Sequence, residues 1–123
     1  MSKKILLIDD EELIIRSLLK LLEKNGYEVF IAKNGQDAVV MAEEEDFDLI
    51  LADIRMPGIN GVEAVDNIYK NTKRNQKKIP AIFMTGYADE IVEKKAKTLA
   101  PVAYIYKPFD KDALLEKIKK TIG

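Results

Sequence analysis

The sequence predicts an α/β fold in which helices cover both faces of a five-stranded parallel sheet, the doubly wound arrangement. Three observations predict it. Short apolar runs alternate along the chain with segments of helical periodicity. The apolar runs lack the polar alternation of a sheet with one wet face, which favours strands buried on both sides. The length of 123 residues suits one such domain, which we expect to cover residues 1–123.

The first half of the chain predicts three strands and two helices. The apolar run Ile5–Ile8 is the first strand, and the apolar positions within Ile14–Leu22 recur at helical spacing. Tyr27–Ala32 lies between two glycine-containing turns and begins next to a charge, so we expect a strand at an edge of the sheet. A second helical face lies within Ala38–Ala42, and Leu49–Ala52 is a second buried strand.

The second half continues the same alternation. Val62–Tyr69 presents a third apolar helical face, and Ala81–Met84 is the next buried strand. Asp89–Ala100 predicts a more polar helix, Val102–Tyr106 a fifth strand, and Leu114–Ile122 a last helix. The order βαβαβαβαβα then implies right-handed crossovers and ligand binding at the carboxyl ends of the strands.

The composition excludes several kinds of chemistry. The chain has no Cys and no His, which excludes thiolate nucleophiles, imidazole bases and a phosphohistidine on this chain. The net charge of -1 gives no global electrostatic reason for nucleic-acid binding. We interpret the basic stretch Lys70–Lys78 as a solvated loop, with a nucleic-acid contact as the weaker alternative. The apolar runs are too short to span a bilayer and no signal peptide is evident, so we expect a cytoplasmic protein.

Polar side chains stand where the predicted strands end. Asp9 and Asp10 follow the first strand, Asp53 ends the third, Thr85 follows the fourth, and Lys107 follows the fifth. The carboxyl ends of parallel strands share one edge of the sheet, so these side chains should converge.

Three converging carboxylates repel one another unless a cation lies among them. An all-oxygen set without His or Cys suits Mg²⁺ or Mn²⁺ better than Zn²⁺. A carboxylate such as Asp53, beside a cation and Lys107, can attack phosphorus to form an acyl phosphate. The Thr85 hydroxyl would donate to the phosphoryl oxygens.

The joint pattern resembles the receiver domain of bacterial two-component response regulators, the CheY-like family. The motifs that carry the resemblance are "DD" at Asp9 and Asp10, "DIRMPGING" with Asp53, "MTG" with Thr85, and "YKPF" with Lys107. They extend over essentially the whole chain in the family's order and spacing. The resemblance implies a flavodoxin-like fold with the strand order 2-1-3-4-5.

The resemblance also implies a metal site. Asp53 is then the phospho-acceptor and a Mg²⁺ ligand, and Mn²⁺ can substitute. Asp10 binds the metal directly, Asp9 acts largely through water, and the backbone carbonyl of Arg55 supplies a further ligand.

For the phosphoryl group and the switch, the resemblance implies four further residues. Thr85 and Lys107 bind the phosphoryl group, and the bond preceding Pro108 is cis. Tyr104 occupies the family's aromatic-switch position and moves inward as Thr85 moves toward the phosphate.

The expected function is therefore that of a signalling switch rather than of an enzyme with a separate substrate. The domain would promote its own phosphorylation and dephosphorylation. Its partners would be a histidine kinase or a histidine phosphotransfer protein, which supplies the His, and a downstream effector protein or domain. We expect neither direct nucleic-acid binding by this domain nor membrane association.

Other interpretations of single residues remain open at this stage. Asp9 and Asp10 could cap the following helix, and Glu11 and Glu12 are interpreted as helix-start residues. Asp53 could be a turn residue, Thr85 and Lys107 could be ordinary surface groups, and Tyr104 could be an ordinary packed ring.

Three alternative functions fit the same motifs less well. A haloacid dehalogenase-like phosphohydrolase needs a second Asp two residues after its nucleophile, where this chain has Arg55. The chain has no glycine-rich nucleotide-binding motif. A receiver-like module that only binds partners should lack an acidic or Lys position, and none is missing here.

Arg55 and Tyr87 are bulky residues at two positions that flank the site. In the family that the chain resembles, the corresponding positions influence the access of hydrolytic water, so we expect a long-lived phosphoryl group. One segment departs from the common family pattern. Ala100-Pro101 stands near the end of the fourth helix, where the family usually has a Gly, which leaves the shape of that helix end open.

Overall fold

The computed structural model of the chain describes residues 2–71 and 78–123. Strands and helices alternate strictly along these ranges. They are β1 (Lys4–Ile8), α1 (Glu12–Lys24), β2 (Glu28–Ala32), α2 (Gly35–Glu44), β3 (Leu49–Asp53), α3 (Gly61–Asn71), β4 (Ala81–Thr85), α4 (Glu90–Thr98), β5 (Ala103–Tyr106) and α5 (Lys111–Ile122). The predicted loop Lys70–Lys78 falls largely on residues 72–77, outside the described residues. No helix in the described ranges is both long and apolar enough to cross a membrane.

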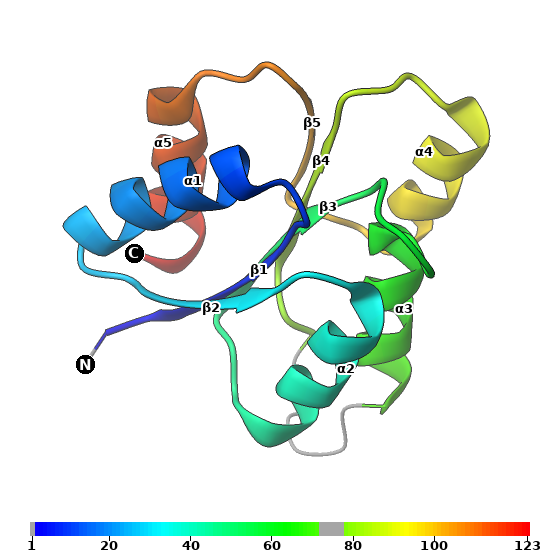
Figure 1. Cartoon of the computed structure of the whole chain (residues 1–123), viewed down its shortest axis with the longest axis horizontal. Coiled ribbons are helices and arrows are strands. Elements are labelled where there is room, and N and C mark those ends of the chain that lie inside the picture. The colour runs from blue at the N-terminus through cyan, green and yellow to red at the C-terminus, as the bar shows by residue number, and fades with distance from the viewer. Residues whose placement is uncertain (1, 72–77) are drawn as a thin grey trace.

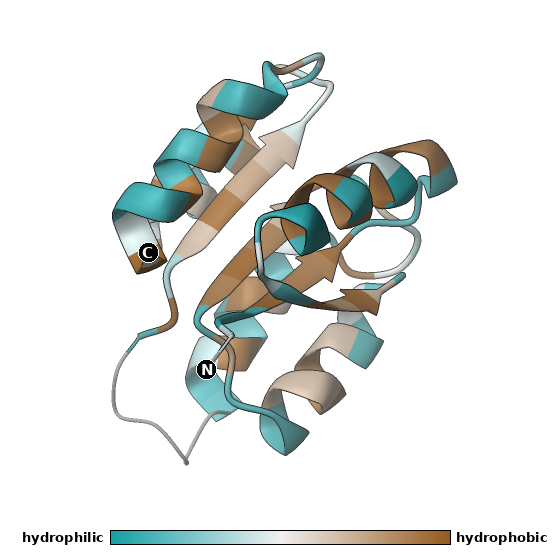
Figure 2. Ribbon diagram, turned by 90° about the vertical axis from the view of Figure 1, so that its left-hand side faces the viewer, coloured by the Kyte–Doolittle hydropathy of each residue, from teal (hydrophilic) through white to brown (hydrophobic). Residues whose placement is uncertain are grey.

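The five strands form one parallel sheet in the order β2-β1-β3-β4-β5, which confirms the predicted order 2-1-3-4-5. α1 and α5 lie on one face of this sheet, and α2, α3 and α4 lie on the other (Figure 1). The strands are apolar and the helices turn polar residues outward (Figure 2). The fold is therefore the doubly wound α/β arrangement that the alternation of elements predicts.

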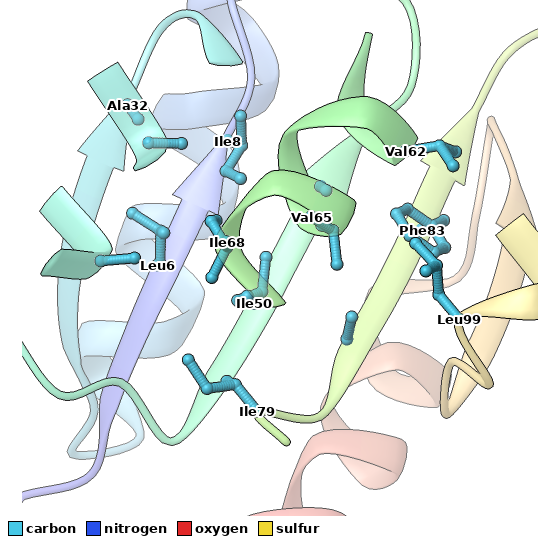
Figure 3. Packing of buried hydrophobic residues seen from close by; sticks show 14 of the residues in the cluster. Leu6, Ile8, Ala32, Ile50, Val62, Val65, Ile68, Ile79, Phe83 and Leu99 are labelled. Carbon is cyan, nitrogen blue, oxygen red and sulfur yellow. The ribbon is translucent and has the colours of Figure 1, made fainter. Parts of the chain in front are cut away.

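Both faces of the central strands are buried, which explains why their sequences are continuously apolar. In β1, Leu6 and Ile8 belong to the cluster beneath α2, α3 and α4, whereas Ile5 and Leu7 belong to the cluster beneath α1 and α5. All four side chains are fully buried. Figure 3 shows the first cluster, in which Val65 and Ile68 of α3 pack onto the strands. The two cores thus fix the sheet between its helices.

Several boundaries differ by a few residues from the sequence-based expectation. β5 begins at Ala103 rather than Val102, which lies in a bend before the strand and is 45% exposed, although its N–H donates to the Ala81 carbonyl at 2.8 Å. At the end of α4, Ala100 adopts a left-handed conformation with φ 51°. The chain therefore keeps a backbone conformation that favours glycine while carrying an alanine, at some conformational cost.

Gly61 lets α3 begin directly against the end of β3. Its N–H donates to the Ile54 carbonyl at 2.9 Å. A Cβ at this position would stand 2.1 Å from the Asp53 carbonyl oxygen. Backbone atoms cannot move aside as a flexible side chain can, so only glycine fits. The close approach fixes the segment that carries Asp53.

We expect Gly61→Ala to lower the free energy of unfolding by about 1–3 kcal/mol, because the new methyl group overlaps the β3 backbone. Thermal denaturation followed by circular dichroism measures the effect. Gly86→Ala is the matched control, since a Cβ there has nothing within 4 Å. Equal melting temperatures for the two variants would contradict the steric argument.

Candidate functional site

The register of the sheet places the ends of β1, β3, β4 and β5 side by side. Ile8 pairs with Ala52, so the next residues, Asp9 and Asp53, are neighbours at the same edge. The Lys107 N–H donates to the Thr85 carbonyl at 2.7 Å, which extends the pairing of β4 and β5 by one residue. The predicted convergence of strand-end side chains follows from this parallel alignment.

The ammonium of Lys107 lies among the carboxylates. Its Nζ is 3.2 Å from Asp53 Oδ1, 3.6 Å from Asp9 Oδ2 and 3.1 Å from Glu11 Oε1. The Lys107 side chain is only 13% exposed. It reaches the carboxylates across the edge of the sheet from β5, and the bond between Lys107 and Pro108 is cis.

Asp9 is fully buried, and its two oxygens have different surroundings. Oδ1 accepts a hydrogen bond from the Glu11 N–H at 2.9 Å. Oδ2 is buried without a hydrogen-bond partner. A buried carboxylate oxygen without a hydrogen bond destabilises the folded protein unless a further positive charge or a hydrogen-bond donor reaches it.

Burial shifts the protonation equilibria of this cluster. It raises the pKa of Asp53 to about 6, the Asp9 charge adds to the rise, and Lys107 opposes it. Burial also raises the pKa of Asp9, against the hydrogen bond from Glu11 and the charge of Lys107. For Lys107, burial lowers the pKa, but the Asp9 and Asp53 charges outweigh it and the net pKa is raised. One lysine therefore compensates these carboxylates only in part.

The cluster has the donor set of a hard-cation site. Carboxylate oxygens of Asp9, Asp10 and Asp53 lie within 4.8 Å of one another. Asp10 is exposed, whereas the other two are buried. Asp9 Oδ2, which lacks a hydrogen bond, and the raised pKa of Asp53 both indicate that the negative charge of the cluster is not fully compensated. These residues fit a divalent cation that prefers oxygen ligands, such as Mg²⁺.

Thr85 is buried, and its hydroxyl is held by the loop that follows β4. Thr85 Oγ1 accepts from the Tyr87 N–H at 3.1 Å and donates to the Tyr87 carbonyl at 3.2 Å. The Arg55 guanidinium stacks over the Tyr87 ring, 4.0 Å from its centroid. This cation–π contact joins the loop after β3 to the loop after β4. Arg55 and Tyr87 are the two bulky residues that the sequence predicts beside the site.

Tyr104 lies next to a cavity of about 400 Å³ that Thr85, Tyr87 and Val92 also line. Its ring packs at a centroid distance of 6.4 Å from Phe83 and 5.6 Å from Tyr106. The Tyr106 hydroxyl donates to Glu93 of α4. The structure therefore places Tyr104 and Thr85 on one cavity between β5, α4 and the loop after β4.

Sequence reasoning missed the role of one side chain in this site. Glu11 is the N-cap residue of α1, but its side chain makes no capping hydrogen bond. Its carboxylate binds Lys107 instead. The interpretation of Glu11 as a helix-start residue is therefore incomplete. Its place beside Asp9 and Asp10 at the same strand end was the available signal, but the pattern does not tell which way its side chain turns.

Without divalent cations, we expect the raised pKa of Asp53 to make folding less favourable as pH rises. The folded state keeps its proton up to about pH 6, whereas an unfolded Asp releases it near 3.8. The contribution of Asp53 to stability therefore falls between about pH 4 and pH 6, by about 3 kcal/mol at most. Asp53→Asn should match the wild type near pH 4 and be more stable at pH 7, measured by urea denaturation in EDTA.

Asp46→Asn is the control for this measurement, because Asp46 is exposed and remote from the cluster. Its stability difference from the wild type should stay flat across the same pH range. If the stability difference between Asp53→Asn and the wild type were also independent of pH, the electrostatic account of the cluster would be contradicted.

Comparisons with known proteins agree with this geometry. The family described as response regulator receiver domain matches residues 5–119. The chain is 38% identical over 121 residues to the transcriptional regulatory protein CrdR of Helicobacter pylori, covering 98% of this chain and 55% of that protein. It is 35% identical over 120 residues to sporulation initiation phosphotransferase F of Bacillus subtilis, covering 98% and 94%. The chain thus spans about half the length of the first relative and nearly all of the second.

Solved structures show the same fold. A CheY-like receiver domain protein from Methanospirillum hungatei superposes with a TM-score of 0.90 at 34% identity, covering 99% of this chain and 94% of that one. The response regulator TrrA of Thermotoga maritima, solved in complex with Mg²⁺-BeF, gives a TM-score of 0.79 at 35% identity, covering 97% and 98%. With the fold, the strand-end cluster and the sequence match in agreement, the chain belongs to the receiver domain family of two-component response regulators.

Proposed function

We propose that residues 1–123 form one receiver domain that accepts a phosphoryl group on Asp53 and thereby changes its partner-binding surface. The observation that carries the proposal is the position of Lys107. Its ammonium lies 3.2 Å from the buried Asp53 carboxylate. Carboxylate oxygens of Asp9, Asp10 and Asp53 lie within 4.8 Å of one another. A nucleophile, a cationic group and a set of metal ligands thus lie together, as phosphoryl transfer to a carboxylate requires.

The proposed reaction transfers the phosphoryl group from a phosphohistidine. An Asp53 carboxylate oxygen forms a bond to phosphorus while the bond between phosphorus and the imidazole nitrogen breaks. The electron pair stays on that nitrogen, and the imidazole takes up a proton. At neutral pH the Asp53 carboxyl, with a pKa of about 6, is mostly ionised and nucleophilic. The chain has no His, so a histidine kinase or a phosphotransfer protein supplies the donor.

The resident metal in this proposal is Mg²⁺, and Mn²⁺ accepts the same oxygen ligands. Asp10 and Asp53 would hold it directly, Asp9 largely through water, and the Arg55 carbonyl would add a ligand. When bound, the cation neutralises negative charge shared by the carboxylates and the incoming phosphoryl group. Lys107 would bind a phosphoryl oxygen.

The switch in this proposal runs from Thr85 to Tyr104. To donate to a phosphoryl oxygen, the Thr85 hydroxyl leaves the Tyr87 backbone that now holds it. The Tyr104 ring then moves into the space that Thr85 vacates, beside the cavity that both residues line. The change in β5 and α4 alters the surface offered to a downstream effector. The domain acts in the cytoplasm as a signalling switch that promotes its own phosphorylation and dephosphorylation.

Incubation with acetyl phosphate and Mg²⁺ tests the proposed function. We expect the intact mass of the wild type to increase by one phosphoryl unit, and Asp53→Asn to gain none, because its amide is not a nucleophile. Omitting Mg²⁺ should suppress the gain. A wild type that gains nothing under these conditions would favour a module that only binds partners.

We also expect the phosphoryl group on Asp53 to persist well beyond seconds at neutral pH with Mg²⁺. The Arg55 and Tyr87 side chains stack on each other in the two loops beside the site, and we infer that together they limit the access of water to the phosphoryl group. Arg55→Ala and Tyr87→Ala should each release phosphate faster than the wild type in a colorimetric phosphate assay. Arg16→Ala removes the same charge from an exposed site on α1 and should have no effect. Loss of the wild-type label within seconds would refute the shielding argument.

A further inference from the structure

The side chain of Glu11 lies at the site without serving the helix that it precedes. It makes no capping hydrogen bond, and the Glu11 N–H is bonded to Asp9 Oδ1. Its carboxylate accepts a hydrogen bond from Lys107 Nζ at 3.1 Å. The neighbouring Glu12 differs, because it lies in the first turn of α1 and binds Lys33. Two adjacent glutamates therefore have different partners, and only Glu11 is in contact with the phosphoryl-binding lysine.

We propose that Glu11 is a positioning residue for Lys107 and competes with the phosphoryl group for its ammonium. This competition holds Lys107 in its resting position. It slows the phosphorylation of Asp53 and makes the phosphorylated state less stable. This inference rests on the proposed function, because it gives Lys107 the phosphoryl oxygen as its second partner.

The crowding of carboxylates around the ammonium creates this competition. An ammonium has three N–H donors. In the resting structure three carboxylates surround Lys107 Nζ, those of Asp53, Asp9 and Glu11. Glu11 Oε1 and Asp53 Oδ1 lie within hydrogen-bond distance of the ammonium, at 3.1 and 3.2 Å, whereas Asp9 Oδ2 is an ion-pair partner at 3.6 Å without a hydrogen bond. A phosphoryl oxygen on Asp53 would share the ammonium with these carboxylates, so its attraction to Lys107 grows if one of them withdraws.

Burial decides which oxygen withdraws. The Asp9 and Asp53 side chains are 0% and 4% exposed, so neither can turn into water. The Glu11 side chain is 58% exposed and regains hydration when it leaves Lys107. Glu11 is therefore the partner of Lys107 that an arriving phosphoryl oxygen replaces.

The negative charge of Glu11 has opposite effects on the binding of the phosphoryl group and on the binding of the metal ion. It repels an anionic phosphoryl donor and attracts a cation. Removing this charge should favour the phosphoryl group and disfavour the metal. A loosened structure would instead weaken binding of both ions, so opposite signs distinguish electrostatic competition from a merely structural role.

The test compares Glu11→Gln with Glu12→Gln, which remove the same charge from adjacent positions. With acetyl phosphate and Mg²⁺, we expect the initial rate of phosphorylation of Glu11→Gln to be about two- to fivefold above the wild type, the range of an exposed ion pair. Calorimetry should show tighter binding of beryllofluoride in saturating Mg²⁺ and weaker binding of Mg²⁺ alone. Glu12→Gln should stay within experimental error of the wild type in all three measurements, because Glu12 binds Lys33 instead.

Glu11→Ala separates competition from simple support of Lys107. Competition predicts that Ala accelerates phosphorylation as Gln does. If Glu11 instead kept Lys107, through its hydrogen bond, in the position that phosphorylation needs, Ala would slow phosphorylation and Gln would not, which would overturn the inference. Equal behaviour of Glu11→Gln and Glu12→Gln would overturn it too, as would a loss of affinity for both ions. A wild type that gains no phosphoryl group would reject the proposed function itself.

Discussion

The site depends on one ammonium placed between carboxylates that would otherwise repel one another. At a separation of about 4 Å, two unit charges in a partly shielded protein environment repel by about 4 kcal/mol. Lys107 compensates part of this repulsion by approaching Asp9 and Asp53 together. It leaves one Asp9 oxygen without a hydrogen bond and the pKa of Asp53 well above its usual range. The resting site therefore retains negative charge that is not fully compensated, and its carboxylates fit a cation that prefers oxygen ligands.

The backbone makes this arrangement possible. Parallel pairing aligns the carboxyl ends of β1 and β3. The backbone therefore makes Asp9 and Asp53 neighbours even though their carboxylates repel each other. The two cores bury both faces of the central strands and hold that alignment. Gly61 brings α3 against the end of β3 at a distance that no side chain tolerates. The favourable packing of the two cores thus offsets the electrostatic repulsion between the carboxylates of the site.

The fold and the location of the site were predictable because they follow from backbone rules. Continuous apolar runs such as Ile5–Ile8 predict buried parallel strands, and parallel strands bring their ends to one edge. The side-chain partners were less predictable. Glu11 turns toward Lys107 rather than capping α1, and the Thr85 hydroxyl bonds to Tyr87. Such choices depend on small differences between competing local contacts, which residue type and spacing do not encode.

The site is also assembled from distant parts of the chain. Glu11 and Lys107 are 96 residues apart and meet only when β5 has joined the edge of the sheet beside β4. During synthesis the N-terminal carboxylates leave the ribosome long before the lysine that compensates them. A nascent chain therefore carries Asp53 without the complete site. Under the proposed function, the ability to accept a phosphoryl group would arrive with the last strand, so phosphorylation of Asp53 would report that the whole domain has folded.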